Sequence, residues 1–87
     1  MKQNFVPISI ERMVAIDLEH NTHIDREEHT RLMKAALVAY KAGYRCRCGN
    51  PIWVAGSPIM KALLCFTCIT GEAMPKDDYE IDEACGG

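Results

Sequence analysis

Several features that would assign a function are absent from this sequence of 87 residues. No apolar run reaches the length of about eighteen residues that a membrane-spanning helix needs, so we expect no membrane span. The first residues lack the apolar stretch and small-residue cleavage site of a secretory signal, which favours a cytoplasmic location. No grouping of nucleophile, base and orienting residue is apparent, and we therefore predict that the protein is not an enzyme.

Large aromatic side chains are scarce, with one Trp, three Tyr and two Phe. A single domain of this length, here residues 1–87, lies near the size at which an apolar core alone becomes marginal. Hydrophobic residues nevertheless make up 48% of the chain, so most of it should fold. We expect a cross-link, either covalent or through a metal ion, to supply additional stability.

Acidic residues are missing from the whole of segment 29–71, which carries six basic side chains. Acidic side chains dominate both flanks, with six against three basic ones in residues 1–28 and six against one in residues 72–87. Such asymmetry is typical of a partner-binding face. The six basic residues of the middle segment are Arg31, Lys34, Lys41, Arg45, Arg47 and Lys61.

Four of the five cysteines fall into two close pairs, Cys46 with Cys48 and Cys65 with Cys68, separated by sixteen residues. In a reducing cytosol such pairs are typical of metal ligands rather than of disulfides. Four thiolates complete the tetrahedral shell of one Zn²⁺, and Gly49 permits the tight turn that the first pair needs. We predict one structural zinc ion, with iron in a rubredoxin-like centre as the alternative metal.

Two other uses of these thiols stay open. Disulfide pairing would follow if the protein reached an oxidising compartment. Thiol redox chemistry at Cys65-x-x-Cys68 would make the protein an enzyme, although no βαβ pattern accompanies the motif. The fifth cysteine, Cys85, is expected to be a free thiol in an acidic tail.

Three histidines, His20, His23 and His29, raise the question of a second metal site. His20 and His23 straddle a predicted turn, and no cysteine lies near them in the sequence. We therefore interpret all three as solvated side chains.

Residues 9–42 are predicted to be helical. Ser9 is a suitable N-cap, and the apolar residues after it recur with the spacing of one helical face. Asp25 begins a second helix as part of a capping box, and this helix should run to about Ala42. Gly43 follows, where a left-handed residue commonly ends a helix.

Residues 43–74 change to a β-like pattern and are predicted to form a zinc ribbon. Its expected antiparallel strands are residues 51–54 and 59–64, joined by a turn at 55–58. Residues 75–87 form the acidic tail. The predicted fold class is α+β, with an N-terminal helix or helical hairpin followed by a small zinc-ribbon β-module.

The run Cys48-Gly49-Asn50-Pro51-Ile52, followed by Cys65-x-x-Cys68, resembles the zinc finger of the DksA/TraR family of bacterial RNA-polymerase regulators. The resemblance covers about residues 43–68. It implies transcription control through protein contact with polymerase, with the helices entering the secondary channel of that enzyme. The chain departs from the family pattern in its Cys46-x-Cys48 spacing, and it lacks the Asp-x-x-Asp-x-Ala motif of the family's working tip.

The leading functional hypothesis is a non-enzymatic zinc-ribbon adaptor or regulator that docks an unidentified protein. Nucleic-acid binding by the basic middle is the alternative, with aromatic stacking beside phosphate contacts. A homodimer through the first helix is a further arrangement that the sequence leaves open. The arginines near the knuckle would equally offset the charge of four thiolates, and Trp53 and Phe66 would equally cover the metal site. The candidate contact residues are Lys41, Tyr44, Arg45, Arg47 and Lys61.

Overall fold

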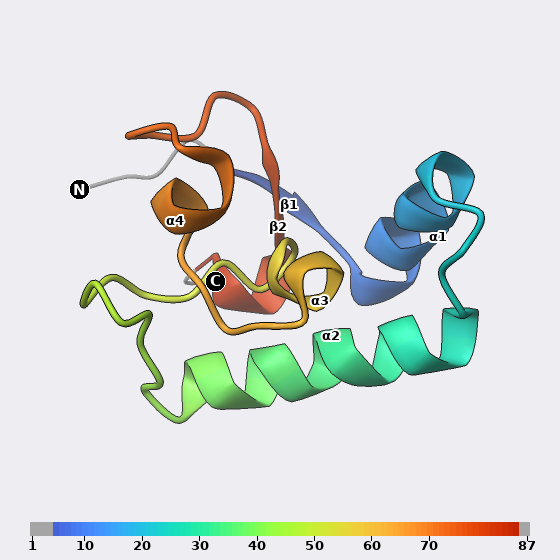
Figure 1. Cartoon of the computed structure of the whole chain (residues 1–87), viewed down its shortest axis with the longest axis horizontal. Coiled ribbons are helices and arrows are strands. Elements are labelled where there is room, and N and C mark those ends of the chain that lie inside the picture. The colour runs from blue at the N-terminus through green and yellow to red at the C-terminus, as the bar shows by residue number, and fades with distance from the viewer. Residues whose placement is uncertain (1–4, 86–87) are drawn as a thin grey trace.

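The computed structural model describes residues 5–85 and shows an α+β fold (Figure 1), as the sequence predicts. Two long helices follow a short first strand, and α2 lies along one side of the molecule with the other elements on its opposite side. In chain order the elements are β1 (Val6–Ile8), α1 (Ile10–His20), α2 (Arg26–Lys41), α3 (Ser57–Met60), α4 (Phe66–Thr70), β2 (Tyr79–Ile81) and the 3₁₀ helix η1 (Asp82–Ala84).

Both long helices begin where the sequence predicts. The Ser9 hydroxyl accepts a hydrogen bond of 3.2 Å from the Arg12 backbone amide. The Asp25 carboxylate accepts one of 2.9 Å from the Glu28 amide. Each cap satisfies an amide that has no partner inside its helix. Gly43, with a φ of 89°, follows α2, so the predicted helical part is confirmed as a hairpin of two helices.

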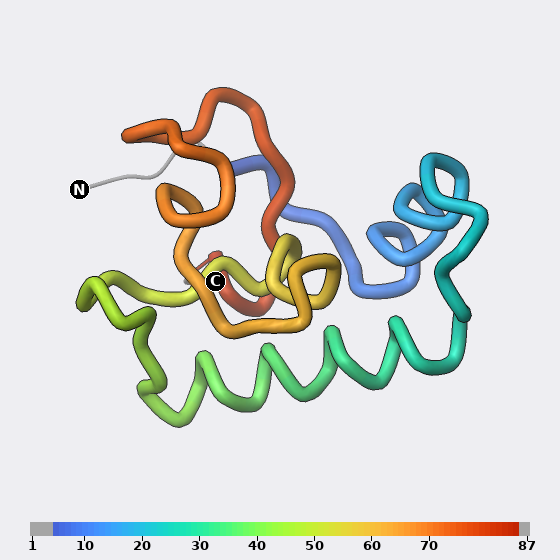
Figure 2. The backbone as a smooth tube through the Cα atoms, viewed as in Figure 1, coloured from blue at the N-terminus to red at the C-terminus, as the bar shows by residue number. Residues whose placement is uncertain are grey.

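A two-stranded parallel sheet joins the two ends of the described chain. Val6 pairs with Tyr79 and Ile8 with Ile81. Figure 2 shows the blue N-terminal segment running beside the red segment that leads into η1. Residues 79–84, which belong to the predicted acidic tail, therefore pack into the body of the molecule, and Ile81 is fully buried.

The two strands predicted within the cysteine-rich segment are wrong. Residues 51–54 form only an isolated antiparallel bridge, between Pro51 and Arg45. Residues 57–60 form the short helix α3. Pro58 lies in the first turn of α3, where its fixed φ favours a helix and its missing amide costs nothing. Lys61, in the left-handed conformation, ends this helix after one turn.

The apolar core lies between the long helices, the strands and the loop that precedes α3. Val14 of α1 and Met33 of α2 meet Val54 and Ile81 there, and each of these side chains is at most 1% exposed. The core therefore links elements from both halves of the sequence, and it is the framework on which the cysteine loops are held.

One carboxylate is buried at the edge of this core. Glu80 of β2 is 3% exposed and accepts three backbone hydrogen bonds of 2.8–2.9 Å, from Val54, Ala55 and Ile81. Burial raises the pKa of Glu80 to about 7, while the three amide donors act in the opposite direction. Glu80 thereby fastens β2 to the loop after the first cysteine pair.

Candidate metal centre

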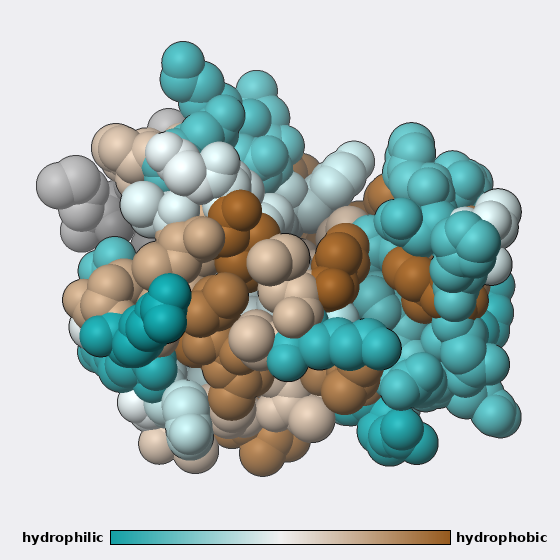
Figure 3. All heavy atoms as spheres, viewed as in Figure 1, coloured by the Kyte–Doolittle hydropathy of each residue, from teal (hydrophilic) through white to brown (hydrophobic). Residues whose placement is uncertain are grey.

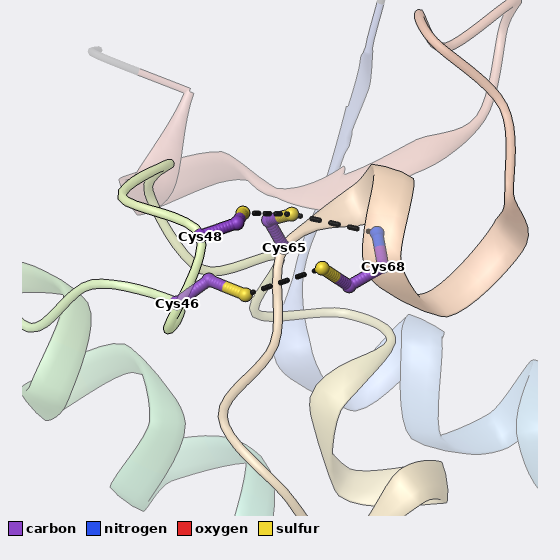
Figure 4. A group of neighbouring side chains, drawn as sticks. All are labelled: Cys46, Cys48, Cys65 and Cys68. Atoms are coloured by element: carbon purple, nitrogen blue, oxygen red, sulfur yellow. Dashed lines mark hydrogen bonds between the residues drawn. The ribbon is translucent and has the colours of Figure 1, made fainter.

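The first cysteine pair lies on a tight turn beyond the end of α2. The Gly49 amide donates to the Cys46 carbonyl at 2.8 Å, and the Cys46 amide donates to the Asn50 carbonyl at 2.9 Å. Gly49 has a φ of 94°, a conformation that costs little only for glycine. The predicted glycine turn is present, and it directs Cys46 and Cys48 toward the second pair (Figure 4).

The second pair lies at the start of a short helix rather than at the end of a strand. Cys65 is the N-cap of α4, and its sulfur accepts a hydrogen bond of 3.4 Å from the Cys68 amide. Gly71, with a φ of 81°, ends α4. A single helical turn thus places both sulfurs on the side that faces the first pair.

The four sulfurs form one compact group. Cys46 Sγ lies 3.5 Å from Cys68 Sγ, and Cys48 Sγ lies 3.3 Å from Cys65 Sγ. All four lie within 4.8 Å of one another. Zn–S bonds of about 2.3 Å in a tetrahedron require sulfur separations of about 3.8 Å. The group therefore has the size and donor set of a site for one metal ion.

The same sulfur–sulfur distances are too long for disulfide bonds. A disulfide bond requires about 2.05 Å between the sulfurs, and all five cysteines are free. The closest contacts also join one cysteine of each pair to one of the other pair, so the two loops meet through their sulfurs.

The electrostatics of the sulfurs differ across the group. Backbone amides, first that of Cys48 and then that of Cys65, lower the pKa of the Cys46 thiol to about 6. The surrounding thiols, first Cys46 and then Cys65 and Cys48, raise the pKa of Cys68 to about 12. The pKa of Cys46 and that of Cys65 are thus lowered, whereas the neighbouring thiols raise the pKa of Cys68 and oppose a fully ionised set. A divalent cation would remove that opposition, because it stabilises every thiolate that it binds.

One side of the centre is covered and the other faces solvent. Cys46 and Cys65 are 3% and 2% exposed, whereas Cys48 and Cys68 are exposed. Trp53 and Phe66 pack edge to face with ring centroids 4.9 Å apart, and the Trp53 indole N–H donates to the Tyr79 carbonyl at 2.8 Å. Both rings line one hollow together with Cys65, so they lie beside the buried side of the centre.

The five candidate contact residues do not form one patch. Tyr44, 60% exposed, lies with Arg45 and Arg47 on the knuckle, where one Arg45 guanidinium N–H donates to the Gly49 carbonyl at 3.3 Å. Lys41, at the end of α2, forms an ion pair with Glu83.

Lys61 is separate from the other four. It follows α3 and lines a hollow with Glu28 and Leu32 of α2. Leu32 and Lys41 are nine residues apart on this helix, a distance of about 14 Å along its axis. Four of the candidates therefore gather at the knuckle end of α2, and Lys61 lies beside the earlier part of that helix.

One prediction about the histidines is wrong. His29 is 3% exposed, and its Nε2 lies 2.8 Å from Oδ2 of Asp17, itself 5% exposed. Burial raises the pKa of the Asp17 carboxyl, and the contact with His29 opposes that effect. The sequence does indicate that Asp17 is buried, because Asp17 follows Ile10 by seven residues and so falls on the apolar face of α1. His20 and His23 are exposed, as predicted.

Within residues 5–85, no helix is both long enough and apolar enough to cross a membrane. Comparisons with protein-family models, with curated proteins and with solved structures give no match to this chain. The arrangement of its own residues is therefore what bears on its function.

Proposed function

We propose that this protein is a small zinc-stabilised module that acts by binding another protein and not by catalysis. The observation that carries the proposal is the group of four sulfurs within 4.8 Å of one another. Cysteine sulfur is a preferred ligand of zinc, and a shell of four thiolates is typical of structural zinc sites. Iron is the alternative metal for the same donors.

The same shell argues against chemistry at the metal. A catalytic zinc ion normally keeps one position for water or substrate, whereas four cysteines fill all four positions. A metal at this point would instead connect the loop after α2 to α4, because each supplies two sulfurs. Metal binding would add stability to a fold whose small apolar core supplies little on its own.

Exposed apolar side chains support a role in protein binding. Val38 of α2 is 67% exposed, and Ile59 and Met60 of α3 are 47% and 49% exposed. Ile59 and Met60 line one hollow with Tyr79, which is 40% exposed, and large apolar side chains close together on a surface are typical of protein interfaces. The resemblance of the knuckle to DksA/TraR zinc fingers adds transcription control as the proposed setting, with RNA polymerase as the first partner to test.

Zinc content in two matched variants tests the metal assignment. Cys65→Ser removes one buried ligand, whereas Cys85→Ser removes the cysteine outside the group. We expect about one zinc per chain in the wild type and in Cys85→Ser. Cys65→Ser should lose the zinc and unfold at much lower urea concentration. Equal zinc content in the two variants would contradict the assignment, and iron in the wild type would correct it.

Nucleic-acid binding is kept as a second candidate because Tyr44 and two arginines are exposed side by side on the knuckle. Phosphate contacts predict affinity for oligonucleotides that falls steeply with added salt. Replacing Arg45 and Arg47 together by Gln should then abolish binding. Absent or salt-insensitive binding to single- and double-stranded probes would remove this candidate.

A further inference from the structure

A hollow of about 410 Å³ lies between α1, α3, α4 and the segment that enters β2. Three of its apolar or aromatic side chains, Ile59, Met60 and Tyr79, are exposed, so the hollow is open to solvent. Figure 3 shows apolar residues gathered at the middle of the face that carries α3, with hydrophilic residues above and to the right. The large apolar and aromatic side chains that line the hollow are Met13, Trp53, Ile59, Met60, Ile69 and Tyr79.

This lining combines a fixed floor with adaptable walls. The Trp53 ring is held in place, because its indole N–H donates to the Tyr79 carbonyl and its edge packs on Phe66. Met13 and Met60 have unbranched, polarisable side chains that adjust to the shape of a ligand. Aromatic residues and methionine are also enriched at protein interfaces. The hollow is therefore suited to the apolar side chains of another protein.

The charged residues that line the hollow are all acidic. They are Asp17, Asp77 and Asp78. Asp17 is buried and paired with His29, so it is not available to a ligand. Asp77 is exposed and Asp78 is half-buried. Among residues 5–85 neither of these two has a cationic side chain within 4.0 Å, since the ion pairs found there are those of His29 and Lys41.

No basic residue among residues 5–85 lines this hollow. Arg12, Lys61 and Lys76 each precede or follow a lining residue in the sequence. Lys61 lines the hollow beside α2 instead. Lys76 contacts Asp78 through its backbone amide. A ligand in the hollow would therefore meet two carboxylates that have no cationic partner among the described residues.

The turn that carries these two carboxylates is held before any ligand binds. The Val6 amide of β1 donates to the Asp78 carbonyl at 2.7 Å, and the Lys76 amide donates to Asp78 Oδ2 at 2.9 Å. Asp77 has a φ of 61°, a left-handed conformation that Asp adopts at lower cost than most residues. Because the turn is already ordered, binding would cost less conformational entropy there.

We propose that this hollow binds a basic amphipathic segment of a partner protein. An apolar side chain of that segment would enter the hollow between Met60 and Tyr79, and lysine or arginine residues beside it would meet Asp77 and Asp78. This inference rests on the proposed function and names the partner chemistry for it.

Other occupants fit this surface less well. A strand added beside β2 would meet an edge that is covered, because the Tyr79 carbonyl accepts from Trp53 and the Glu80 carboxylate accepts from the next two amides of that loop. A nucleic acid would place phosphates beside Asp77 and Asp78. A second copy related by two-fold symmetry would bring equivalent carboxylates together. A second copy that used its basic knuckle would assemble into rings or filaments.

Fluorescence anisotropy with a designed probe tests the hollow. The probe is a labelled synthetic peptide with leucines along one face and lysines beside them. One control is a scrambled peptide of the same composition, which keeps the charge and loses the apolar face. The other replaces every lysine by glutamate. We expect the probe to bind the zinc-loaded full chain saturably and more weakly as salt is added. The scrambled peptide should bind much more weakly, and the glutamate peptide should not bind.

Two kinds of variant connect the binding to this surface. Asp77→Asn removes one charge, keeps a residue that tolerates a positive φ, and should weaken binding roughly fivefold. Adding Asp78→Asn, whose amide oxygen can still accept from Lys76, should bring the loss to about tenfold. Met60→Ala shortens an exposed apolar side chain and should weaken binding about fivefold.

Two matched variants lie outside the hollow. Glu27→Gln removes the same charge as Asp77→Asn, from an exposed position on α2. Val38→Ala shortens an apolar side chain that is 67% exposed. Both should bind the probe as the wild type does. All variants are compared at one zinc per chain and at the unfolding midpoint of the wild type.

Five results would overturn the proposal. They are equal binding of the probe and the scrambled peptide, equal losses in Asp77→Asn and Glu27→Gln, displacement of the probe by an oligonucleotide, self-association that Asp77→Asn abolishes, and no binding of the probe. The last result in protein that carries one zinc per chain would reject the hollow as a binding site and leave the zinc module intact. Absence of metal from the wild type would instead reject the proposed function.

Discussion

The position of Gly56 against the only tryptophan offers a sharp test of the packing beneath the metal centre. A Cβ at this position would lie 2.5 Å from Cζ3 of the Trp53 indole and closer still to Cε3. The indole cannot simply move aside, because its N–H is bonded to Tyr79 and its ring packs on Phe66. Gly56→Ala should therefore force the ring out of its position.

The loss of folding stability caused by Gly56→Ala can be estimated from these contacts. Overpacking of a tight site costs about 1–3 kcal/mol, and loss of the indole hydrogen bond adds roughly 0.5–1.5 kcal/mol. We expect the free energy of unfolding to fall by about 2–4 kcal/mol, a large share of the stability of so small a domain. Urea unfolding followed by Trp53 fluorescence measures the change, and the emission of the folded variant should also shift to longer wavelength.

A matched glycine variant and a double mutant separate the clash from other effects. Gly43 has a φ of 89°, and a Cβ there would meet no atom within 4 Å. Gly43→Ala should therefore cost only backbone strain, about 1 kcal/mol. In a Trp53→Leu background the ring is gone, and Gly56→Ala should cost almost nothing more, with urea unfolding followed there by far-UV circular dichroism because the chain then has no tryptophan. An unchanged emission spectrum, with a loss no greater than that of Gly43→Ala, would refute this account.

Two further predictions concern the buried ionisable groups. His29→Ala leaves the Asp17 carboxylate buried without its partner and should lower the free energy of unfolding in urea by about 3–5 kcal/mol. His23→Ala, at an exposed position, should lower it by less than about 0.5 kcal/mol. Equal losses in the two variants would contradict the buried pair. Because burial raises the pKa of Glu80 to about 7 from 4.5, the folded protein keeps a proton that the unfolded chain has lost, so rising pH favours unfolding. The stability of the wild type relative to Glu80→Gln should accordingly fall by about 1 kcal/mol between pH 6 and pH 8, and a rise would mean that the three amide donors outweigh burial.

The parts of the structure that the sequence predicts are those that neighbouring residues determine. Ser9, Asp25 and Gly43 set helix ends through contacts within one turn of the chain, and all three occupy the predicted positions. The two cysteine pairs are also local signals, because each pair lies on a single turn. That the two pairs come together in one group of four sulfurs could be expected, because structural zinc sites prefer four such ligands.

The parts that the sequence does not predict depend on residues far apart in the chain. Residues 51–64 contain β-branched and apolar residues that suit strands, yet Pro58 and the packing of Trp53 favour a loop and one helical turn. The pairing of Asp17 with His29 joins two helices, and only their packing makes it visible. The burial of Glu80 likewise depends on amides 25 and 26 residues before it.

The parallel pairing of β1 with β2 has a consequence for the order of folding. Its partners lie 73 residues apart, so closing this loop costs more chain entropy than forming the helical hairpin or either cysteine turn. Non-local contacts of this kind also slow folding. During synthesis the helices and both cysteine loops leave the ribosome before residues 79–81, so the four sulfurs can gather before the sheet closes. Until β2 arrives, Ile8 and the amides of Val54 and Ala55 lack their partners, so the nascent chain exposes an unpaired strand edge of the kind that promotes aggregation.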